Sequence, residues 1–138
     1  MVCYSSLLNQ VFMNLLANAI EALSDAATQT DEPLKEPQIV IRTQTHRVQS
    51  LSSTEKVTDL AVIQIRDNGL GMSQDVLEHI FDPFFTTKPV GKGTGLGLSI
   101  SYKIVVEQHG GQLRCLYKAG QGTSFIVEIP LNLKPSQI

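Results

Sequence analysis

The pattern of hydrophobic positions along the chain predicts three helices and four strands. The first helix is expected from about residue 7 to residue 23, because apolar side chains recur there with a period of 3.6 residues. Its apolar face consists of Leu8, Phe12, Leu15, Leu16, Ala19, Ile20 and Leu23. A polar segment over residues 24–37, which contains Pro33 and Pro37, is predicted to be a loop.

The rest of the chain alternates between strand and helix patterns. Four segments show the hydrophobic alternation typical of strands: 38–45, 59–67, 112–119 and 123–131. A long polar hairpin loop is predicted over residues 46–57. A short helix is predicted over 73–80 with Ser73 as its N-cap, and a longer helix over 98–109, ended by Gly110 and Gly111. The tail after Leu131 is expected to fray.

This order of elements predicts an α/β (α+β) two-layer sandwich. Because the strands are connected in local pairs, the sheet is expected to be mixed and mostly antiparallel, with the helices on one face. The helix order argues against a doubly wound nucleotide-binding fold. A length of 138 residues suits one domain spanning 1–138.

Composition narrows the possible partners. The net charge is −2 and there is no long basic run, so we expect no nucleic-acid partner. Cys3 and Cys115 are too few and too far apart for a disulfide framework or a zinc site, and we interpret both as small hydrophobes. No apolar run approaches the ~20 residues that cross a bilayer, and no signal peptide is recognisable. We therefore expect a cytoplasmic domain without direct membrane contact.

Glycine occupies every second position from 91 to 97 in the stretch KPVGKGTGLGLSI. A glycine costs about 0.5–1 kcal/mol relative to Ala in regular structure, so this density indicates unusual backbone angles or a ligand against bare main chain. The stretch is no P-loop, because Lys92 is followed by Gly93, and it lacks the spacing of a dinucleotide fingerprint. The amides that open the following helix could instead bind a phosphate.

Polar residues also follow one side of the first helix, opposite its apolar face: Gln10, Asn14, Asn18, Glu21 and Asp25. Such a stripe is usually a solvated face. The alternative is that the amide oxygens of Asn14 and Asn18 ligate a hard cation such as Mg²⁺.

The segment IRDNGLGM places Asp67 at the end of a strand, with Gly69 and Gly71 close behind. One interpretation is a plain Asp-Asn-Gly turn. The other is a carboxylate that accepts a hydrogen bond from an exocyclic amine beside accessible backbone.

Five segments in this order carry a resemblance to a known family: NQVFMNLLANAIEAL, DNGLGM, FDPFFTTK, GKGTGLGL and GQGTSF. They resemble the N, G1, F, G2 and final glycine boxes of the histidine kinase catalytic and ATP-binding domain. That family belongs to the superfamily of gyrase, heat-shock chaperone and histidine kinase ATPases. The resemblance covers nearly the whole chain and implies the Bergerat ATP-binding fold, with ATP and Mg²⁺ as ligands.

The resemblance implies a role for individual residues at the adenine end. Asp67 would accept a hydrogen bond from the adenine amino group, with Thr123 supporting it directly or through water. Gly69 and Gly71 would let the base lie against the chain.

At the phosphate end, Asn18 would ligate Mg²⁺, and Asn14 would lie near the metal and the phosphates. Lys88 or Lys92 would reach the γ-phosphate. The phosphate-facing lid and helix start would consist of Gly93, Thr94, Gly95, Leu96, Gly97 and Leu98. The lid would be anchored at its base by Phe81, Phe84 and Phe85.

One position favours a kinase over an ATPase. In the ATPase relatives a Glu four residues before the metal-binding Asn activates water, whereas this chain has Asn14, whose amide cannot take a proton. None of His46, His79 and His109 has the sequence context of the family's phosphoacceptor, so we interpret all three as structural.

The chain is therefore expected to be the carboxy-terminal piece of a larger sensor kinase that lacks the dimerisation and phosphoacceptor domain. Its partners would be that domain of the same parent and, downstream, a response regulator. Alone, it is expected to bind ATP and Mg²⁺ without phosphorylating itself.

Two alternatives remain. One is a Ser kinase domain of the pyruvate dehydrogenase kinase kind, which shares these boxes. The other is a nucleotide-dependent protein-binding switch similar to an anti-sigma factor. The intact FDPFFTTK and GTGLGL segments argue against the switch, because those relatives usually have weaker lids.

Overall fold

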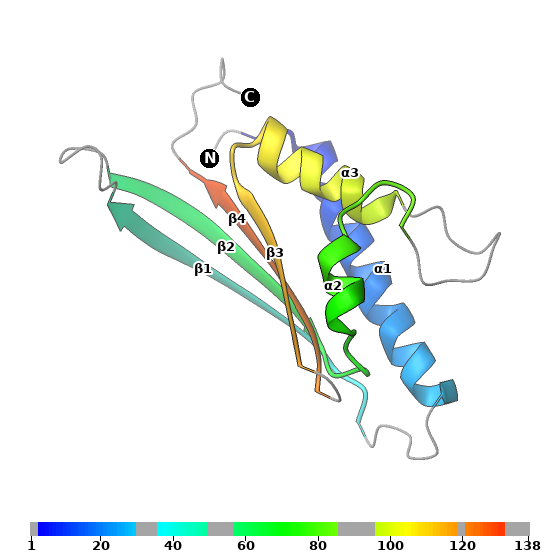
Figure 1. Ribbon diagram of the computed structural model, residues 1–138. Helices are drawn as coiled ribbons and strands as arrows, with labels where there is room; N and C mark the ends of the chain where they lie inside the picture. Colours follow the sequence, from blue (N-terminus) through cyan, green and yellow to red (C-terminus); the bar gives the residue numbers. More distant parts are fainter. Residues whose placement is uncertain (1–2, 30–35, 50–56, 86–95, 119–120, 132–138) are drawn as a thin grey trace.

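In the part of the chain that the structure describes, a four-stranded sheet forms one layer and helices form the other (Figure 1). The computed structural model describes residues 3–29, 36–49, 57–85, 96–118 and 121–131. Its elements are α1 (Ser5–Gln29), β1 (Ile39–Gln49), β2 (Val57–Asp67), α2 (Gln74–His79), α3 (Gly97–Lys103), the π-helical turn η1 (Ile104–Gln108), β3 (Gln112–Lys118) and β4 (Gly122–Pro130). The predicted order of elements is confirmed.

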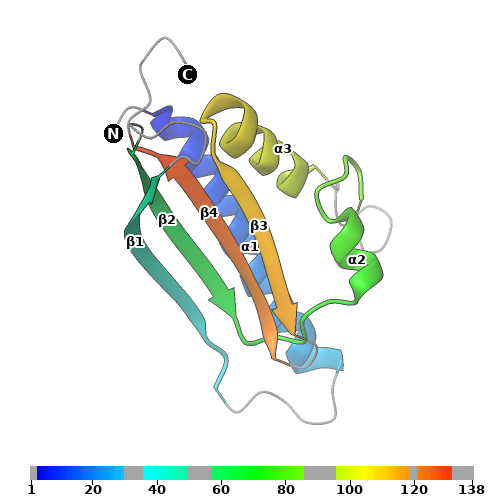
Figure 2. The same ribbon diagram turned by 60° about the vertical axis from the view of Figure 1, so that its left-hand side comes forward.

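The strand order is β1-β2-β4-β3, and each neighbouring pair of described strands is antiparallel. Two views show the helices on the same side of this sheet, so the predicted two-layer sandwich is confirmed (Figures 1 and 2). Burial alternates along the central strand β4, where Thr123, Phe125, Val127 and Ile129 are buried. The alternation is the period of a strand with one covered face.

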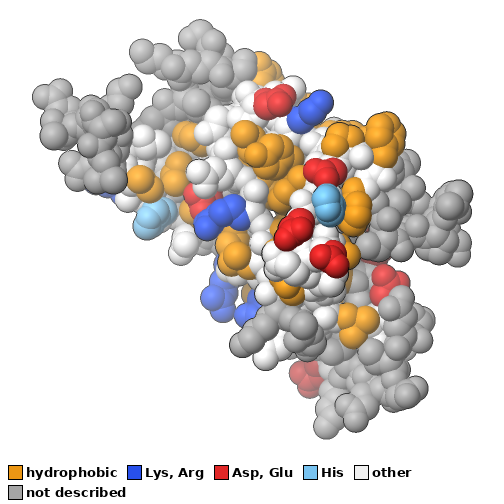
Figure 3. All heavy atoms as spheres, viewed as in Figure 1, with side chains coloured by type: hydrophobic (Ala, Val, Ile, Leu, Met, Phe, Trp, Pro, Cys, Tyr) orange, Lys and Arg blue, Asp and Glu red, His pale blue; other side chains and the backbone are white. Residues whose placement is uncertain are grey.

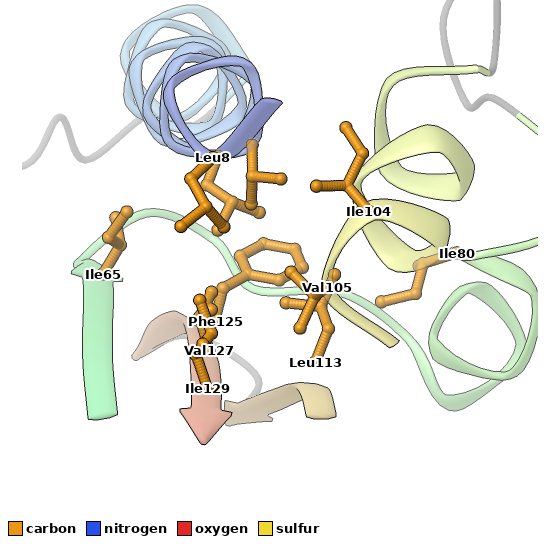
Figure 4. Close-up of a cluster of buried hydrophobic side chains, with 11 residues drawn as sticks. Leu8, Ile65, Ile80, Ile104, Val105, Leu113, Phe125, Val127 and Ile129 are labelled. Atoms are coloured by element: carbon orange, nitrogen blue, oxygen red, sulfur yellow. The ribbon is translucent and has the colours of Figure 1, made fainter. Parts of the chain in front are cut away.

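The core lies between α1, the α3–η1 helix and the covered face of the sheet (Figure 4). From α1 it receives a stripe with spacings of three and four residues, which includes Leu8, Val11 and Leu15. Phe125 and Val127 meet this stripe from β4, while Ile104 and Val105 are contributed by η1. Figure 4 shows Leu8 of α1, Ile104 and Val105 of η1 and Phe125 and Val127 of β4 pointing toward one another.

The structure corrects the predicted first helix in two respects. The helix continues to Gln29 instead of ending near residue 23, and Ala26 near its end is only 1% exposed. Ile20, which we assigned to the apolar face, is 57% exposed, whereas Val11 is fully buried. The buried stripe is narrower than the hydrophobic face in the sequence, because α1 contacts the sheet on one side only. No helix in the described ranges is long and apolar enough to cross a membrane.

The first hairpin and the last helix also differ from the prediction. Residues 46–49 and Val57, predicted as loop, belong to β1 and β2, where backbone pairing accommodates polar side chains on both strands. Arg47 lies opposite Asp59 in the register, and the two side chains form an ion pair at 3.0 Å. The helix predicted over 98–109 changes to π-helical hydrogen bonding from Ile104 onward.

Both predicted helix-end signals are confirmed. The Ser73 hydroxyl accepts a hydrogen bond from the Val76 amide at 3.3 Å, which caps α2. After the end of η1, Gly110 has a φ of 64°, and its amide donates to the Val106 carbonyl at 3.1 Å. This left-handed residue ends the helix and turns the chain into β3.

His109 joins the start of α1 to the end of η1. Its side chain is fully buried; Nδ1 lies 2.7 Å from the Ile104 carbonyl, and Nε2 accepts a hydrogen bond from the Tyr4 amide at 3.0 Å. Because a carbonyl can only accept, Nδ1 carries the proton and the imidazole is neutral. The structural role predicted for His109 is confirmed.

We expect His109→Ala to lower the free energy of unfolding by about 3 kcal/mol, because loss of the fully buried ring leaves a cavity and removes hydrogen bonds to the Ile104 carbonyl and the Tyr4 amide. His46→Ala, at an exposed position of β1, is the control and should change it by less than about 0.5 kcal/mol. Urea denaturation measures both. Equal stability of the two variants would contradict the role assigned to His109.

Candidate functional site

A buried carboxylate lies where β2 ends. Asp67 is 3% exposed, and its Oδ1 accepts a hydrogen bond from the Gly69 amide at 2.9 Å. The residue opposite Asp67 on β4 is Thr123, which is also buried and whose backbone amide hydrogen-bonds the same carboxylate. The sequence prediction that brings Asp67 and Thr123 together is therefore matched by the sheet register.

Burial raises the pKa of Asp67 above its ordinary value, while the hydrogen bonds from the Gly69 and Thr123 amides oppose that rise. The two amides therefore hold the carboxylate in place and compensate part of its desolvation. A group with this combination of burial, fixed geometry and shifted pKa is a candidate for ligand recognition.

The main chain approaches Asp67 closely on two sides. A Cβ placed on Gly122 would lie 2.0 Å from the Asp67 carbonyl oxygen, and Gly122 has a φ of 106°. A Cβ on Gly69 would lie 3.0 Å from both Asp67 Oδ1 and the carbonyl oxygen of Ala22 in α1. The turn after β2 thus lies close against α1, and a side chain at Gly69 would force its neighbours to shift. Gly71, the second glycine of the turn, has a φ of 75°.

Asn68 has a structural role in the turn. Its Nδ2 donates to the Glu36 carbonyl at 2.8 Å, and its Oδ1 accepts from the Gln38 amide at 2.8 Å. The Asp-Asn-Gly turn is therefore real, but its Asp and its Asn serve different neighbours. The turn is confirmed, and the interpretation of Asp67 as an acceptor for an exocyclic amine stays a prediction.

Further along α1, the Asn14 side chain contacts the start of α3. Its Nδ2 donates to the Gly97 carbonyl at 3.2 Å and to the Ser101 hydroxyl at 3.2 Å. Asn14 is half-buried, so this part of the polar stripe faces another helix instead of open solvent. Gly97, predicted at the helix start, begins α3 between Leu96 and Leu98, which are also half-buried.

Asn18 lies one turn after Asn14 and is half-buried, as is Glu21, whereas Gln10 and Asp25 at the two ends of the stripe are exposed. Ala22, beside the Asp67 turn, and Asn14, beside Gly97, are two turns apart, about 12 Å along the helix axis. Asn18 lies between them. One helix thus connects the buried carboxylate to the start of α3.

The chemistry of the donors fits Mg²⁺ held jointly with phosphates. Amide oxygens such as those of Asn14 and Asn18 are hard ligands of the kind Mg²⁺ takes, and this ion usually binds one or two protein groups plus phosphate and water. Within the described residues no group of three His, Cys, Asp or Glu side chains could hold a metal ion. The described residues therefore do not form a metal site of protein ligands alone.

The three phenylalanines before the glycine stretch differ in their packing and exposure. Phe81 packs on Tyr102 with ring centroids 5.3 Å apart, and Phe85 on His79 at 5.8 Å, which suits an anchor. Phe84 is 73% exposed with a φ of 65°, so the prediction that it anchors this segment is wrong. Its backbone conformation directs the ring outward.

The helical side of the surface carries an acidic group over α2 (Figure 3). His79 lies 2.8 Å from Asp82, and hydrogen bonding to Asp82, with the charges of Glu78 and Asp75, raises the pKa of the imidazole. This histidine is an exposed ion-pair partner at the helix end. Both cysteines are free, and burial raises the pKa of Cys115 to about 12, in keeping with its interpretation as a small hydrophobe.

Five predicted site residues lie outside the described ranges: Lys88, Lys92, Gly93, Thr94 and Gly95. Sequence reasoning gave no role of their own to two residues that the structure brings to the site. Gly122 was named only as part of the GQGTSF segment, the final glycine box of the resemblance, and Ser101 was not singled out. The signal for Ser101 is its spacing, four residues after Gly97, which places it one turn along the same helix face.

A family described as "Histidine kinase-, DNA gyrase B-, and HSP90-like ATPase" matches residues 3–133. The match covers most of the chain, and the chain therefore belongs to this family. The resemblance of the five sequence segments is confirmed.

Within the family, similar curated proteins include sensor kinases and a sporulation kinase. Sensor kinase CckA of Brucella abortus (strain 2308) is 39% identical over 125 residues, 88% of this chain and 12% of that protein. Sporulation kinase E of Bacillus subtilis (strain 168) is 35% identical over 131 residues, which are 94% of this chain and 14% of that protein. Sensor histidine kinase ZraS of Escherichia coli (strain K12) is 35% identical over 126 residues, 91% and 22%. The chain thus spans less than a quarter of each of these relatives.

Solved structures give the same assignment. The catalytic domain of histidine kinase ThkA, in a nucleotide-free form, aligns with a TM-score of 0.66 at 32% identity, over 93% of this chain and 69% of that one. The mycobacterial sensor histidine kinase MprB aligns with a TM-score of 0.68 at 24% identity, over 94% and 76%, a likeness of fold. The sandwich described above is that of histidine kinase catalytic domains.

We expect Gly122→Ala to lower the free energy of unfolding by about 3 kcal/mol or more, because the new Cβ overlaps the Asp67 carbonyl in a left-handed conformation. Gly97→Ala is the matched control. There a new Cβ would lie 3.8 Å from Asn14 Cγ, an ordinary van der Waals distance, so stability should be unchanged or slightly higher. Thermal or urea unfolding compares the pair. A tolerated Gly122→Ala would contradict the close approach at Asp67.

Proposed function

We propose that this chain is the ATP- and Mg²⁺-binding catalytic domain of a two-component sensor histidine kinase. It would supply the γ-phosphoryl group to a histidine on a separate dimerisation domain of the same parent protein, which would pass it to a response regulator. The observation that carries the proposal is the buried Asp67 carboxylate, fixed by two amides at one end of a helix whose polar side chains lead to Gly97. Family membership and the sensor kinases among its relatives support it.

At one end of the site, Asp67 would recognise adenine. The exocyclic amine of adenine is a hydrogen-bond donor, and an ionised carboxylate held in a fixed position is its natural acceptor. Thr123, beside Asp67 in the register, would support the base directly or through water. The bare backbone at Gly69 and Gly71 would lie against the ring.

At the other end, Asn18 and Asn14 would face the phosphates, with Asn18 as the proposed magnesium ligand. Bound Mg²⁺ would offset the negative charge of the triphosphate. Leu96, Gly97 and Leu98 would present the α3 start to the phosphates. The same role is proposed, from the sequence, for Gly93, Thr94 and Gly95, with Lys88 or Lys92 at the γ-phosphate.

The chemistry of Asn14 favours transfer to a protein acceptor over hydrolysis. A general base must take a proton, but the Asn14 amide is already a donor to two α3 groups. Without a base at this position, water is a poor nucleophile. The nucleotide would then wait for an acceptor histidine supplied by another domain.

Two alternative functions must be distinguished from this proposal by experiment. A Ser kinase of the pyruvate dehydrogenase kinase kind would phosphorylate serine on a partner, and an anti-sigma-like switch would bind nucleotide to control a partner without transferring phosphate. The sensor kinases among the relatives favour the histidine kinase. We propose a cytoplasmic setting for this domain, whether or not the parent is membrane-anchored.

We expect Asp67→Asn to weaken adenine nucleotide binding by about 1–3 kcal/mol while the fold is retained. The amide oxygen can still accept from the Gly69 backbone, but the NH₂ group that replaces the other carboxylate oxygen would face the adenine amine as a second donor. Calorimetry with ADP measures the loss. Unchanged affinity would contradict the adenine assignment.

We also expect affinity for ADP to fall with acidification through the raised pKa of Asp67, at a pH above the ordinary Asp value of about 3.9. The sign follows because adenine needs the ionised acceptor, and protonation removes it. Titrations across this pH range should show the effect in the unmodified chain. Asp67→Asn should lack it, and an identical pH profile in both would count against the carboxylate.

We expect Asn18→Ala to abolish the gain in ATP affinity that Mg²⁺ provides, since the proposed ligand oxygen is lost. Asn9→Ala is the matched control, because Asn9 is an exposed asparagine of the same helix. Calorimetric titrations with ATP, with and without Mg²⁺, compare the variants. Retention of the full gain in Asn18→Ala would exclude Asn18 as the ligand.

Incubated alone with radiolabelled ATP and Mg²⁺, the chain is expected to remain unlabelled. Addition of the dimerisation domain of the parent should give an acid-labile phosphohistidine on that domain. An acid-stable phosphoserine would indicate the Ser kinase instead, and binding without any transfer would indicate the switch. Acid-labile label on the chain alone would contradict the expectation that it lacks its acceptor.

A further inference from the structure

Three polar atoms form a closed triangle between α1 and α3. Asn14 Nδ2 lies 3.2 Å from the Gly97 carbonyl oxygen and 3.2 Å from the Ser101 hydroxyl oxygen. The Ser101 hydroxyl in turn donates to the Gly97 carbonyl at 2.8 Å. Ser101 is fully buried, so no bulk water competes for these bonds.

The proton positions in this triangle follow from the chemistry of the groups. A carbonyl oxygen only accepts, so the end of the Asn14 amide that faces Gly97 must be its NH₂ group. The single hydroxyl proton of Ser101 is directed to the Gly97 carbonyl, which leaves the Ser101 oxygen as an acceptor for Asn14. Both bonds described for the Asn14 side chain are therefore donated by Nδ2, and Oδ1 is directed away from them.

From this geometry we propose that Ser101 is a positioning residue for Asn14. It holds the amide with Nδ2 on α3 and Oδ1 available to the phosphates and Mg²⁺. The proposal rests on the proposed function, in which Asn14 lies beside the triphosphate. Gly97 alone would leave the amide with a single anchor, and a second acceptor from the next turn of α3 removes that rotational freedom.

The triangle also connects the amide to the position of α3. Gly97 is the first residue of that helix, and the Ser101 hydroxyl bonds back to it across one turn. A displacement of the helix start therefore changes the orientation of Asn14. The position of α3 and the orientation of the Asn14 oxygen are therefore coupled.

A second serine on α3 separates this role from ordinary helix packing. Ser99 is 5% exposed, and its hydroxyl donates to the Leu96 carbonyl at 3.0 Å. It thus shares with Ser101 the burial and the bond to backbone at the helix start. The bond to Asn14 distinguishes Ser101, so Ser99→Ala is a matched control for Ser101→Ala.

The experiment measures ATP affinity by calorimetry with and without Mg²⁺ for the unmodified chain, Ser101→Ala, Ser99→Ala, Asn14→Ala and the double variant Asn14→Ala/Ser101→Ala. We expect Ser101→Ala to reduce the Mg²⁺-dependent gain in affinity about tenfold and Ser99→Ala less than about twofold. The double variant should equal Asn14→Ala, because Ser101 acts through Asn14. Melting temperatures of the two serine variants should be similar.

Equal Mg²⁺-dependent gains in Ser101→Ala and Ser99→Ala would overturn the positioning role, as would a double variant in which the two losses simply multiply. Either result, obtained with an unmodified chain that binds ATP and Mg²⁺, would leave the proposed function intact. An unmodified, folded chain that binds no ATP would overturn the proposed function, and the positioning role with it.

Discussion

The burial of one carboxylate, that of Asp67, governs the arrangement of the site. Asp67 is buried at the end of β2, and an ionised group in such a place is costly unless polar neighbours compensate it. Two backbone amides do so, one from the turn that follows and one from the neighbouring strand β4. The turn and the strand pairing are thus tied to the same side chain. The approach of Gly122 to the Asp67 carbonyl constrains the main chain from the other side.

Helix α1 links the turn that follows Asp67 to the rest of the site. Its buried stripe packs on the sheet and α3, while its polar stripe runs between the Asp67 turn and the start of α3. A rigid helix therefore fixes the separation between the Asp67 carboxylate, which is proposed to recognise a base, and the start of α3, which is proposed to face phosphates. Because Asn14 is bonded to Gly97 and Ser101, helix packing and site geometry share the same contacts. In this design the core aligns the site, and few side chains are needed for chemistry.

The features predicted correctly from the sequence are those with local causes. Ser73 caps a helix because its hydroxyl reaches an amide in the next turn, and Gly110 ends one because it adopts a left-handed conformation. Asp67 and Thr123 were paired through the resemblance of their segments, and the strand register agrees. The two helix-end signals depend on residue type and spacing alone, whereas the pairing of Asp67 with Thr123 rested on the family resemblance.

The features that were missed depend on tertiary packing. Hydrophobicity cannot tell that Ile20 is exposed while Val11 is buried, because that depends on the angle at which α1 meets the sheet. The shift to π-helical bonding at Ile104 is likewise invisible in the sequence, and it coincides with the burial of His109 between two elements. Ser101 appears as an ordinary helical serine until α1 is placed beside it.

The most direct test of this account is calorimetry of the folded chain with ADP and, separately, with GDP. Asp67 as a fixed acceptor predicts heat of binding with ADP and markedly weaker binding of GDP, because guanine presents a carbonyl oxygen where adenine presents an amine. Equal affinities for the two nucleotides, or no heat with ADP from folded protein, would contradict the account.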